Sequence, residues 1–247
     1  MSRIRVFAGP AEAGAAAATE IAALVRAKPD AVLGLATGAT PLPLYRELVR
    51  RHREEGLDLS RVRTFNLDEY WPIDPEHPAS FRRAMLEHLI RPAGIPEANF
   101  HIPDGRTPPE RLVAAAEAYE QAIAAAGGID LQVLGLGLNG HVGFNEPGSH
   151  AGSRTRLVEL AEQTRRRAAA AFPGEEPPRH GLTVGLATIR SARRLRILAF
   201  GREKAAIVAR AVGAAPDPAV PATLLVDHPD LEWFLDRAAA ARLPDRV

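Results

Sequence analysis

Three short segments of this chain contain polar residues whose types and spacing are suited to chemistry. Residues 37–40 (TGAT) combine two hydroxyls with a glycine turn. Asp68 and Glu69 are adjacent carboxylates, and the glycine-rich segment 137–146 contains His141. Hydroxyls and free amides at a helix start bind anions, whereas a carboxylate or an imidazole can transfer protons. The sequence therefore offers one candidate anion site and two candidate proton-transfer groups.

The two carboxylates are not expected to serve one cleft together. Adjacent side chains at the end of a strand point in different directions, so at most one of Asp68 and Glu69 should enter a cleft directly. A carboxylate in that place can act as a general base if it lies within hydrogen-bond reach of the substrate. The alternative for either residue is a helix cap or a surface salt bridge.

His141 is followed five residues later by Glu146. A carboxylate that hydrogen-bonds one ring nitrogen fixes the tautomer of the imidazole and leaves the other nitrogen free for proton transfer. The alternative is an isolated loop histidine. The surrounding glycines allow a ligand to approach the backbone closely, which favours the first interpretation.

Two nucleotide-binding interpretations fail on spacing. Gly135 to Gly140 form a GxGxxG pattern after an expected strand, with Glu159 downstream, but this fingerprint should open a helix and the sequence FNEP that follows is a poor helix start. Residues 34–41 lack the lysine of a Walker A loop. The eight histidines form no recognisable metal-ligand spacing, so no metal is expected.

These segments lie between short apolar runs and longer helical patterns that alternate along the chain. Strands are predicted at 4–7, 31–36, 62–67, 131–136 and 195–200, and helices at 11–26, 43–53, 80–89, 110–126, 156–172 and 203–212. Repeated strand–helix units predict an α/β fold: a three-layer, Rossmann-like architecture with an open, mainly parallel sheet and helices on both faces. No linker divides residues 1–247, so one domain is predicted. Ligands of such sheets bind at the carboxyl ends of the strands, where all three segments lie.

Composition restricts the partners of the chain. The 247 residues carry a net charge of +1 and no cysteine. A near-neutral charge gives no reason to expect nucleic acid or a membrane surface as partner. No apolar run is long enough for a membrane span, and the amino terminus lacks the apolar core of a signal peptide. A cytoplasmic protein that binds a small molecule is expected.

Read together, the motifs resemble those of the glucosamine-6-phosphate deaminase family. The matching segments, in the same order and at similar spacing, are GLATGATPLPLY, FNLDEYWPI, HPASF, LGLGLNGHVGFNEPG, SRTR, LTVGLATI and GREKA, from about residue 30 to residue 210. The combination of NLDEY with NGHVGFNEPG is highly specific. The related 6-phosphogluconolactonases carry Asp-Glu-Arg where this chain has Asp68-Glu69-Tyr70.

The resemblance implies the conversion of glucosamine 6-phosphate and water to fructose 6-phosphate and ammonia. It implies that Asp68 moves a proton from C2 to C1 of the open-chain sugar. His141 would act as the acid and base of ring opening, assisted by Glu146 and Asn139. The positions implied in substrate binding are Thr37, Gly38, Ala39, Thr40, Gly137 and Lys204.

The sequence departs from the family at the phosphate end. The family's phosphate-binding arginine is expected at position 170, which is Ala170 here. Arg166 and Arg167 lie four and three residues earlier, and we expect Arg167 or Arg166 to substitute, the alternative being solvent-facing arginines. Other open functions are a sugar lactonase, a deaminase of a different amino sugar and a non-catalytic sugar-phosphate sensor. Either a monomer or a homo-oligomer fits the sequence, with the monomer preferred.

Overall fold

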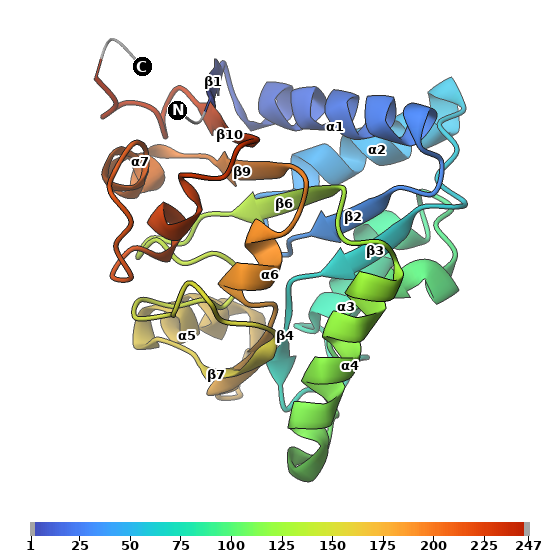
Figure 1. Ribbon diagram of the computed structural model, residues 1–247, viewed down its shortest axis with the longest axis vertical. Coiled ribbons are helices and arrows are strands. Elements are labelled where there is room, and N and C mark those ends of the chain that lie inside the picture. Colours follow the sequence, from blue (N-terminus) through green and yellow to red (C-terminus); the bar gives the residue numbers. More distant parts are fainter. Residues whose placement is uncertain (1–2, 245–247) are drawn as a thin grey trace.

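The central layer of the molecule is a seven-stranded sheet in which all neighbouring strands are parallel (Figure 1). The computed structural model describes residues 3–244; residues 1–2 and 245–247, the two ends of the predicted domain, lie outside this range. In spatial order the strands are β1 (Arg3–Phe7), β10 (Leu231–Asp236), β9 (Leu195–Ala199), β6 (Leu131–Gly135), β2 (Val32–Leu35), β3 (Arg63–Asn66) and β5 (Phe100–His101).

Helices cover both faces of this sheet. One face carries α1 (Pro10–Ala27), α2 (Leu42–Glu55), α3 (Phe81–Met85) and a π-helical turn (Leu86–Ile90); the other carries α4 (Leu112–Ala125), α6 (Leu186–Arg190) and α7 (Ala205–Ala211). Short 3₁₀ turns occupy Glu97–Asn99, Pro109–Arg111, Ala169–Ala171, Arg202–Lys204 and Pro221–Leu225. Within residues 3–244 no helix is long and apolar enough to cross a membrane.

The alternation of side chains along each strand builds a separate core on each face. In β10, Trp233 and Leu235 belong to the core beneath α4, α6 and α7, whereas Phe234 belongs to the core beneath α1 and α2. Such continuous apolar strands are typical of a parallel sheet buried on both sides. The predicted three-layer α/β class is therefore confirmed.

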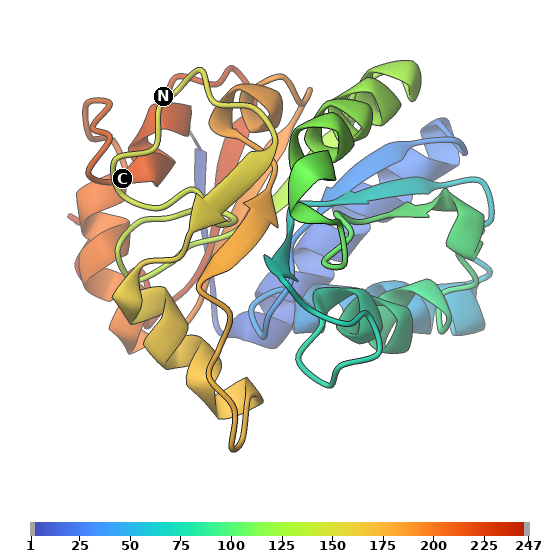
Figure 2. The same ribbon diagram turned by 90° about the horizontal axis from the view of Figure 1, so that it is seen from below.

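A second, antiparallel sheet lies below the first in Figure 1. It consists of β4 (Asp68–Trp71), β8 (His180–Thr183) and β7 (Arg156–Glu159), and α5 (Glu162–Ala168) continues from β7 (Figure 2). The predicted helix over 156–172 is thus wrong in its first part. Residues 156–159 pair with β8, with Leu157 toward α4 and Val158 against the core around Phe144, so tertiary pairing overrides the local helical pattern.

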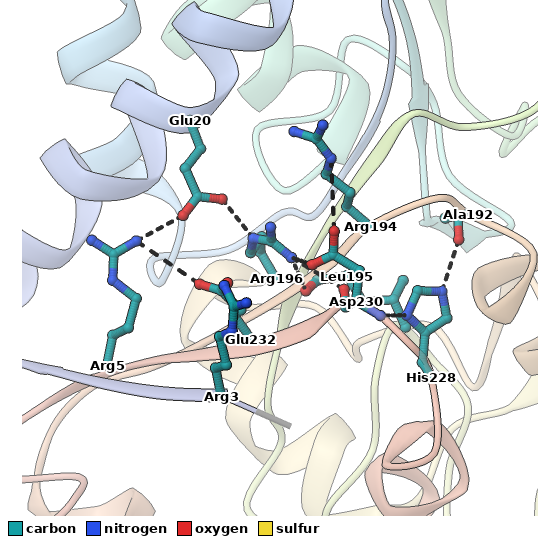
Figure 3. Close-up of polar contacts among 10 residues, drawn as sticks. All are labelled: Arg3, Arg5, Glu20, Ala192, Arg194, Leu195, Arg196, His228, Asp230 and Glu232. Carbon is teal, nitrogen blue, oxygen red and sulfur yellow. Dashed lines mark hydrogen bonds and ion pairs between the residues drawn. The ribbon is translucent and has the colours of Figure 1, made fainter. Parts of the chain in front are cut away.

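Charged side chains tie the amino ends of β9, β10 and β1 to α1 (Figure 3). Arg196 in β9 is buried; its Nε lies 2.6 Å from Glu20 of α1 and its Nη1 lies 2.9 Å from Asp230. Glu20 also pairs with Arg5 at 2.7 Å. The buried guanidinium therefore connects a helix, a central strand and the loop before β10.

We expect the replacement Arg196→Met to lower the free energy of unfolding by about 2 kcal/mol, because it leaves two partly buried carboxylates without their shared partner. Arg194→Met is the matched control: Arg194 is half-exposed and lies 3.8 Å from the same Asp230, so its loss should cost about 0.5 kcal/mol or less. Urea unfolding of the three proteins measures both effects. Equal losses of unfolding free energy in the two variants would contradict the stabilising role of the buried Arg196.

Candidate active site

The expected polar segments meet in one cleft of about 440 Å³. It lies beyond the carboxyl ends of β9, β6, β2 and β3, which are adjacent in the sheet. The chain runs from β2 toward one sheet edge and from β6 toward the other, so the cleft opens where the strand order reverses. This is the position at which open α/β sheets bind ligands.

Asp68 is the first residue of β4 and lines the cleft. Its carboxylate is buried, and Oδ1 accepts a 3.2 Å hydrogen bond from the hydroxyl of Thr37. Burial raises the pKa of Asp68 to about 7; the Thr37 hydrogen bond opposes this shift, and the charge of Glu69 adds to it. A carboxylate with a pKa near 7 is a stronger base than an exposed one and remains partly ionised at neutral pH.

Glu69 points away from the cleft. Its buried carboxylate accepts hydrogen bonds from Ser80 Oγ and from the backbone amides of Tyr70, Phe81 and Arg82, at 2.8–3.0 Å. It thereby caps α3 together with Ser80, whose hydroxyl accepts from the backbone amide of Arg83. Only one of the two adjacent carboxylates enters the cleft, as expected, and the other fixes the strand that presents it.

His141 also lines the cleft and is backed by Glu146. The His141 Nδ1 atom lies 3.2 Å from Glu146 Oε2. Gly137 makes room for the imidazole: a Cβ atom at Gly137 would lie 2.4 Å from the ring. A glycine is therefore required beside the ring, and the Nε2 side of the imidazole is left for a ligand.

Four donors hold the Glu146 carboxylate. Besides His141, they are Asn139 Nδ2 at 2.8 Å, Thr164 Oγ1 at 2.6 Å and the backbone amide of Ala161 at 3.4 Å. Burial favours a raised pKa for Glu146, but the hydrogen bond and charge of His141, with Thr164 and Asn139, hold it below the usual value. Glu146 is thus kept ionised beside the imidazole.

Asn139 acts on the imidazole only through its neighbours. The resemblance implies that Asn139 assists His141; its amide donates to Glu146, and its Oδ1 accepts the backbone N–H of His141 at 3.2 Å. Asn139 and Glu146 lie behind His141 rather than among the residues that line the cleft. The residue at 139 therefore orients the carboxylate and the loop.

Part of the cleft lining is polar and basic. The loop of Thr37, Gly38, Ala39 and Thr40 forms it, with Lys204 and Arg167. Lys204 Nζ donates to the carbonyl of Leu136 at 2.6 Å. Burial lowers the pKa of Lys204 to about 8, the charge of Arg167 lowers it further, and Glu203 opposes both. These cations and hydroxyls form a site for an anion.

The structure distinguishes the two candidate arginines. Arg167 lines the cleft and pairs with Glu203 at 2.9 Å, whereas Arg166 is not among the lining residues and pairs with Glu162 on the exposed side of α5. Ala170 is exposed and does not line the cleft either. Arg167 is therefore the guanidinium of α5 that is available to a bound anion.

Thr164 is a cleft residue that no sequence motif marks. The residue lines the cleft, donates to Glu146 and lies 3.5 Å from His141 Nδ1. No local pattern marks it, since its partners are 18 and 23 residues away in the chain.

In the described part of the chain, no group of three or more His, Asp or Glu side chains is placed to hold a metal ion.

Comparisons with known proteins extend this description. A family model for glucosamine-6-phosphate isomerases and 6-phosphogluconolactonase matches residues 10–233. A glucosamine-6-phosphate deaminase of Arthrobacter sp. (strain FB24) is 48% identical over 239 residues, which cover 96% of this chain and 91% of that protein. Another, from Geobacillus sp. (strain WCH70), is 44% identical over 230 residues and covers 93% and 91% of the two chains.

Two solved structures illustrate the range of the fold. A monomeric glucosamine-6-phosphate deaminase superposes with a TM-score of 0.94 at 37% identity, over 97% of this chain and 99% of that one. The 6-phosphogluconolactonase of Trypanosoma brucei superposes with a TM-score of 0.78 at 24% identity, over 99% of each chain. The second likeness is one of fold alone.

Proposed function

The chain belongs to the family of glucosamine-6-phosphate isomerases and 6-phosphogluconolactonases, and within this family we propose that it is a deaminase converting glucosamine 6-phosphate and water to fructose 6-phosphate and ammonia. Identities of 43–48% to several glucosamine-6-phosphate deaminases, over at least 92% of the chain, support this activity. The observation that carries the proposal is the cleft itself. It brings Asp68 and His141 into one cleft with the cations Lys204 and Arg167 and the hydroxyls of loop 37–40.

His141 acts first in the proposed sequence. A closed pyranose has no acidic proton at C2, so the ring must open before that proton can move. The imidazole removes the proton of the C1 hydroxyl as the C1 carbonyl forms, and the resulting imidazolium gives this proton to the ring oxygen as its bond to C1 breaks. Glu146, 3.2 Å from Nδ1, stabilises the imidazolium that arises.

Asp68 then acts on the open chain. Its carboxylate removes the proton at C2, now acidified by the adjacent carbonyl, and returns a proton to C1. The product is an imine at C2, which water hydrolyses to the ketose and ammonia. Lys204, Arg167 and the loop 37–40 hold the phosphate, so that C2 stays within reach of the base. None of these steps uses an added cofactor.

Ammonia release tests the proposal most directly. The purified protein should release one ammonia per fructose 6-phosphate formed from glucosamine 6-phosphate. A lactonase would instead open 6-phosphogluconolactone with the uptake of base and without ammonia, and a sensor would bind the amino sugar without turnover. The same assay on galactosamine 6-phosphate measures the epimer preference. No ammonia from either sugar would refute the proposal.

The pH profile should be bell-shaped. Asp68 must be ionised to act, and its raised pKa of about 7 means that kcat/KM should fall about tenfold per unit as the pH drops below 7. Lys204, with a pKa of about 8, loses its charge above that pH, so KM should rise on the alkaline side. Lys204→Arg should remove the alkaline limb and keep the acid limb. An acid limb near pH 4 would contradict the role of a buried base.

Arg167→Ala should raise KM for glucosamine 6-phosphate by about 10- to 100-fold, with kcat measured beside it, because the phosphate loses one charged contact. Arg166→Ala is the matched control from the next position of the same helix. It should leave both constants within about twofold, because Arg166 is not among the residues that line the cleft. Equal effects of the two changes would remove Arg167 from the phosphate site.

We also propose that residues 1–247 act as one domain and that the protein is a cytoplasmic monomer. Support for one domain comes from the cleft, which takes residues from both sheets. Support for the monomer comes from the likeness to a solved deaminase described as monomeric. Sedimentation at micromolar protein concentration tests the assembly state.

A further inference from the structure

Helix α5 contributes two side chains to the cleft, one beside the proton-transfer pair and one among its cationic residues. Thr164 and Arg167 are three residues apart, so they lie on one face of the helix, one turn from each other. Thr164 contacts Glu146 and approaches His141, whereas Arg167 lines the cleft with Lys204. One rigid element therefore touches the proton-transfer pair and the anion site at once.

The two oxygens of Glu146 are held by different parts of the chain. Oε2 faces His141 and accepts from Asn139, both in the glycine-rich loop. Oε1 accepts from Thr164 Oγ1 and from the backbone amide of Ala161, the residue that precedes α5. Both partners of Oε1 thus belong to α5 or its amino-terminal cap. The position of this helix therefore determines the orientation of the Glu146 carboxylate.

Few other groups hold α5 in place. Ala168 is its only buried residue, and the following Phe172 packs against Tyr70 and His77. A further attachment on the cleft side is the ion pair between Arg167 and Glu203, and the Nε atom of Arg165 is buried. A bound phosphate offers Arg167 a stronger partner than Glu203, with two or more oxygens in bidentate reach. Binding of an anion at this site therefore affects the position of α5.

We propose that α5 couples the anion site to the proton-transfer pair, with Thr164 as the positioning residue. A phosphate bound by Arg167 holds the helix in position. The helix then places Thr164 and the Ala161 amide within hydrogen-bond distance of Glu146, and the carboxylate fixed in this way orients the imidazole of His141. The proposal rests on the proposed deaminase function, because it assigns His141 the ring-opening step. Thr164 does not touch the sugar; it acts through Glu146.

The test compares Thr164→Val, which keeps the shape and removes the hydroxyl, with Thr164→Ser, which keeps the hydroxyl. The valine variant should lower kcat for glucosamine 6-phosphate by about 10- to 100-fold, the effect of losing a hydrogen bond to a charged group, with KM within about threefold. The serine variant should restore kcat to within about threefold of the wild type. Gln163→Ala, an exposed neighbour, should change neither constant.

A second measurement needs no turnover. Inorganic phosphate should shift the ring ¹⁵N resonances of His141 in the wild type and in Thr164→Ser. In Thr164→Val, phosphate should bind with a Kd within about threefold of the wild type and yet leave these resonances unmoved. This result would show that the variant has lost the coupling between bound phosphate and His141 and has kept its phosphate affinity.

Three results would overturn the coupling. They are a valine variant with wild-type kcat, a serine variant as impaired as the valine variant, and a phosphate-induced His141 shift that survives in Thr164→Val. If the wild type releases no ammonia from either amino sugar, the deaminase proposal fails by itself. The phosphate titration of His141 then still decides whether α5 connects the anion site to His141.

Discussion

Asp68→Asn should abolish most turnover of glucosamine 6-phosphate, lowering kcat by about 10²- to 10⁴-fold or more. The amide has nearly the shape of the carboxylate, and its oxygen can still accept the Thr37 hydrogen bond, so KM should stay close to the wild-type value. Only the ability to take the C2 proton is lost. Steady-state ammonia release measures the change, and a variant with near-normal kcat would remove Asp68 from the role of base.

Protein stability provides an independent measure of the same change. Because the folded-state pKa of Asp68 is raised from 3.8 to about 7, its ionisation disfavours the folded state as pH rises through that window. The asparagine variant lacks this cost, so it should be at least as stable as the wild type at pH 8. Glu69→Gln is the matched control, since it replaces an acceptor of four hydrogen bonds. Glu69→Gln should lower the free energy of unfolding and have a smaller effect on kcat than Asp68→Asn.

Glu146→Gln should slow the reaction of the closed-ring substrate by about 10²-fold, within the range for lost acid–base assistance. The reason is the geometry at His141: Glu146 contacts the ring at Nδ1, while Asn139 supplies no charge and bonds only the backbone of the histidine. A neutral amide in place of Glu146 leaves the imidazolium without its counter-charge.

The comparison that isolates ring opening uses an analogue whose 4- and 5-hydroxyls are methylated, so that no ring can form. Glu146→Gln should slow its proton transfer at C2 much less than it slows the natural substrate, because Asp68 carries out that step. The solvent exchange of the C2 proton measures it. Equal slowing of both substrates would contradict the division of labour between His141 and Asp68.

The central sheet and the edge that carries the site can be predicted from sequence because their signals are local. Apolar runs at 31–36, 62–67, 131–136 and 195–200 each become a parallel strand, within one or two residues at either end. Parallel strands bring their carboxyl ends to one edge. The loop 37–40, Asp68 and His141 therefore lie at one edge of the sheet, and they share one cleft because β6, β2 and β3 are adjacent strands.

The small sheet cannot be predicted in the same way. Its strands have four residues each, and they are stabilised by pairing over separations of more than 100 residues in the case of β4 and β8. Residues 156–159 fit a helix as well as a strand until β8 lies beside them. The same non-local origin explains Thr164 and the contact of Arg167 with Glu203, 36 residues away.

Only Leu67 separates the last residue of β3 from Asp68, the first residue of β4. Asp68, the proposed general base, thus stands where the backbone leaves one sheet and enters the other, while loop 37–40 and Lys204 follow strands of the larger sheet. A sugar phosphate that contacts Asp68 and Lys204 together would connect the two sheets for as long as it stays bound. By mass action, ligand at a hundred times its Kd adds about 2.7 kcal/mol to the stability of the folded form. Heat resistance of this enzyme in the cell should therefore follow the supply of its own substrate.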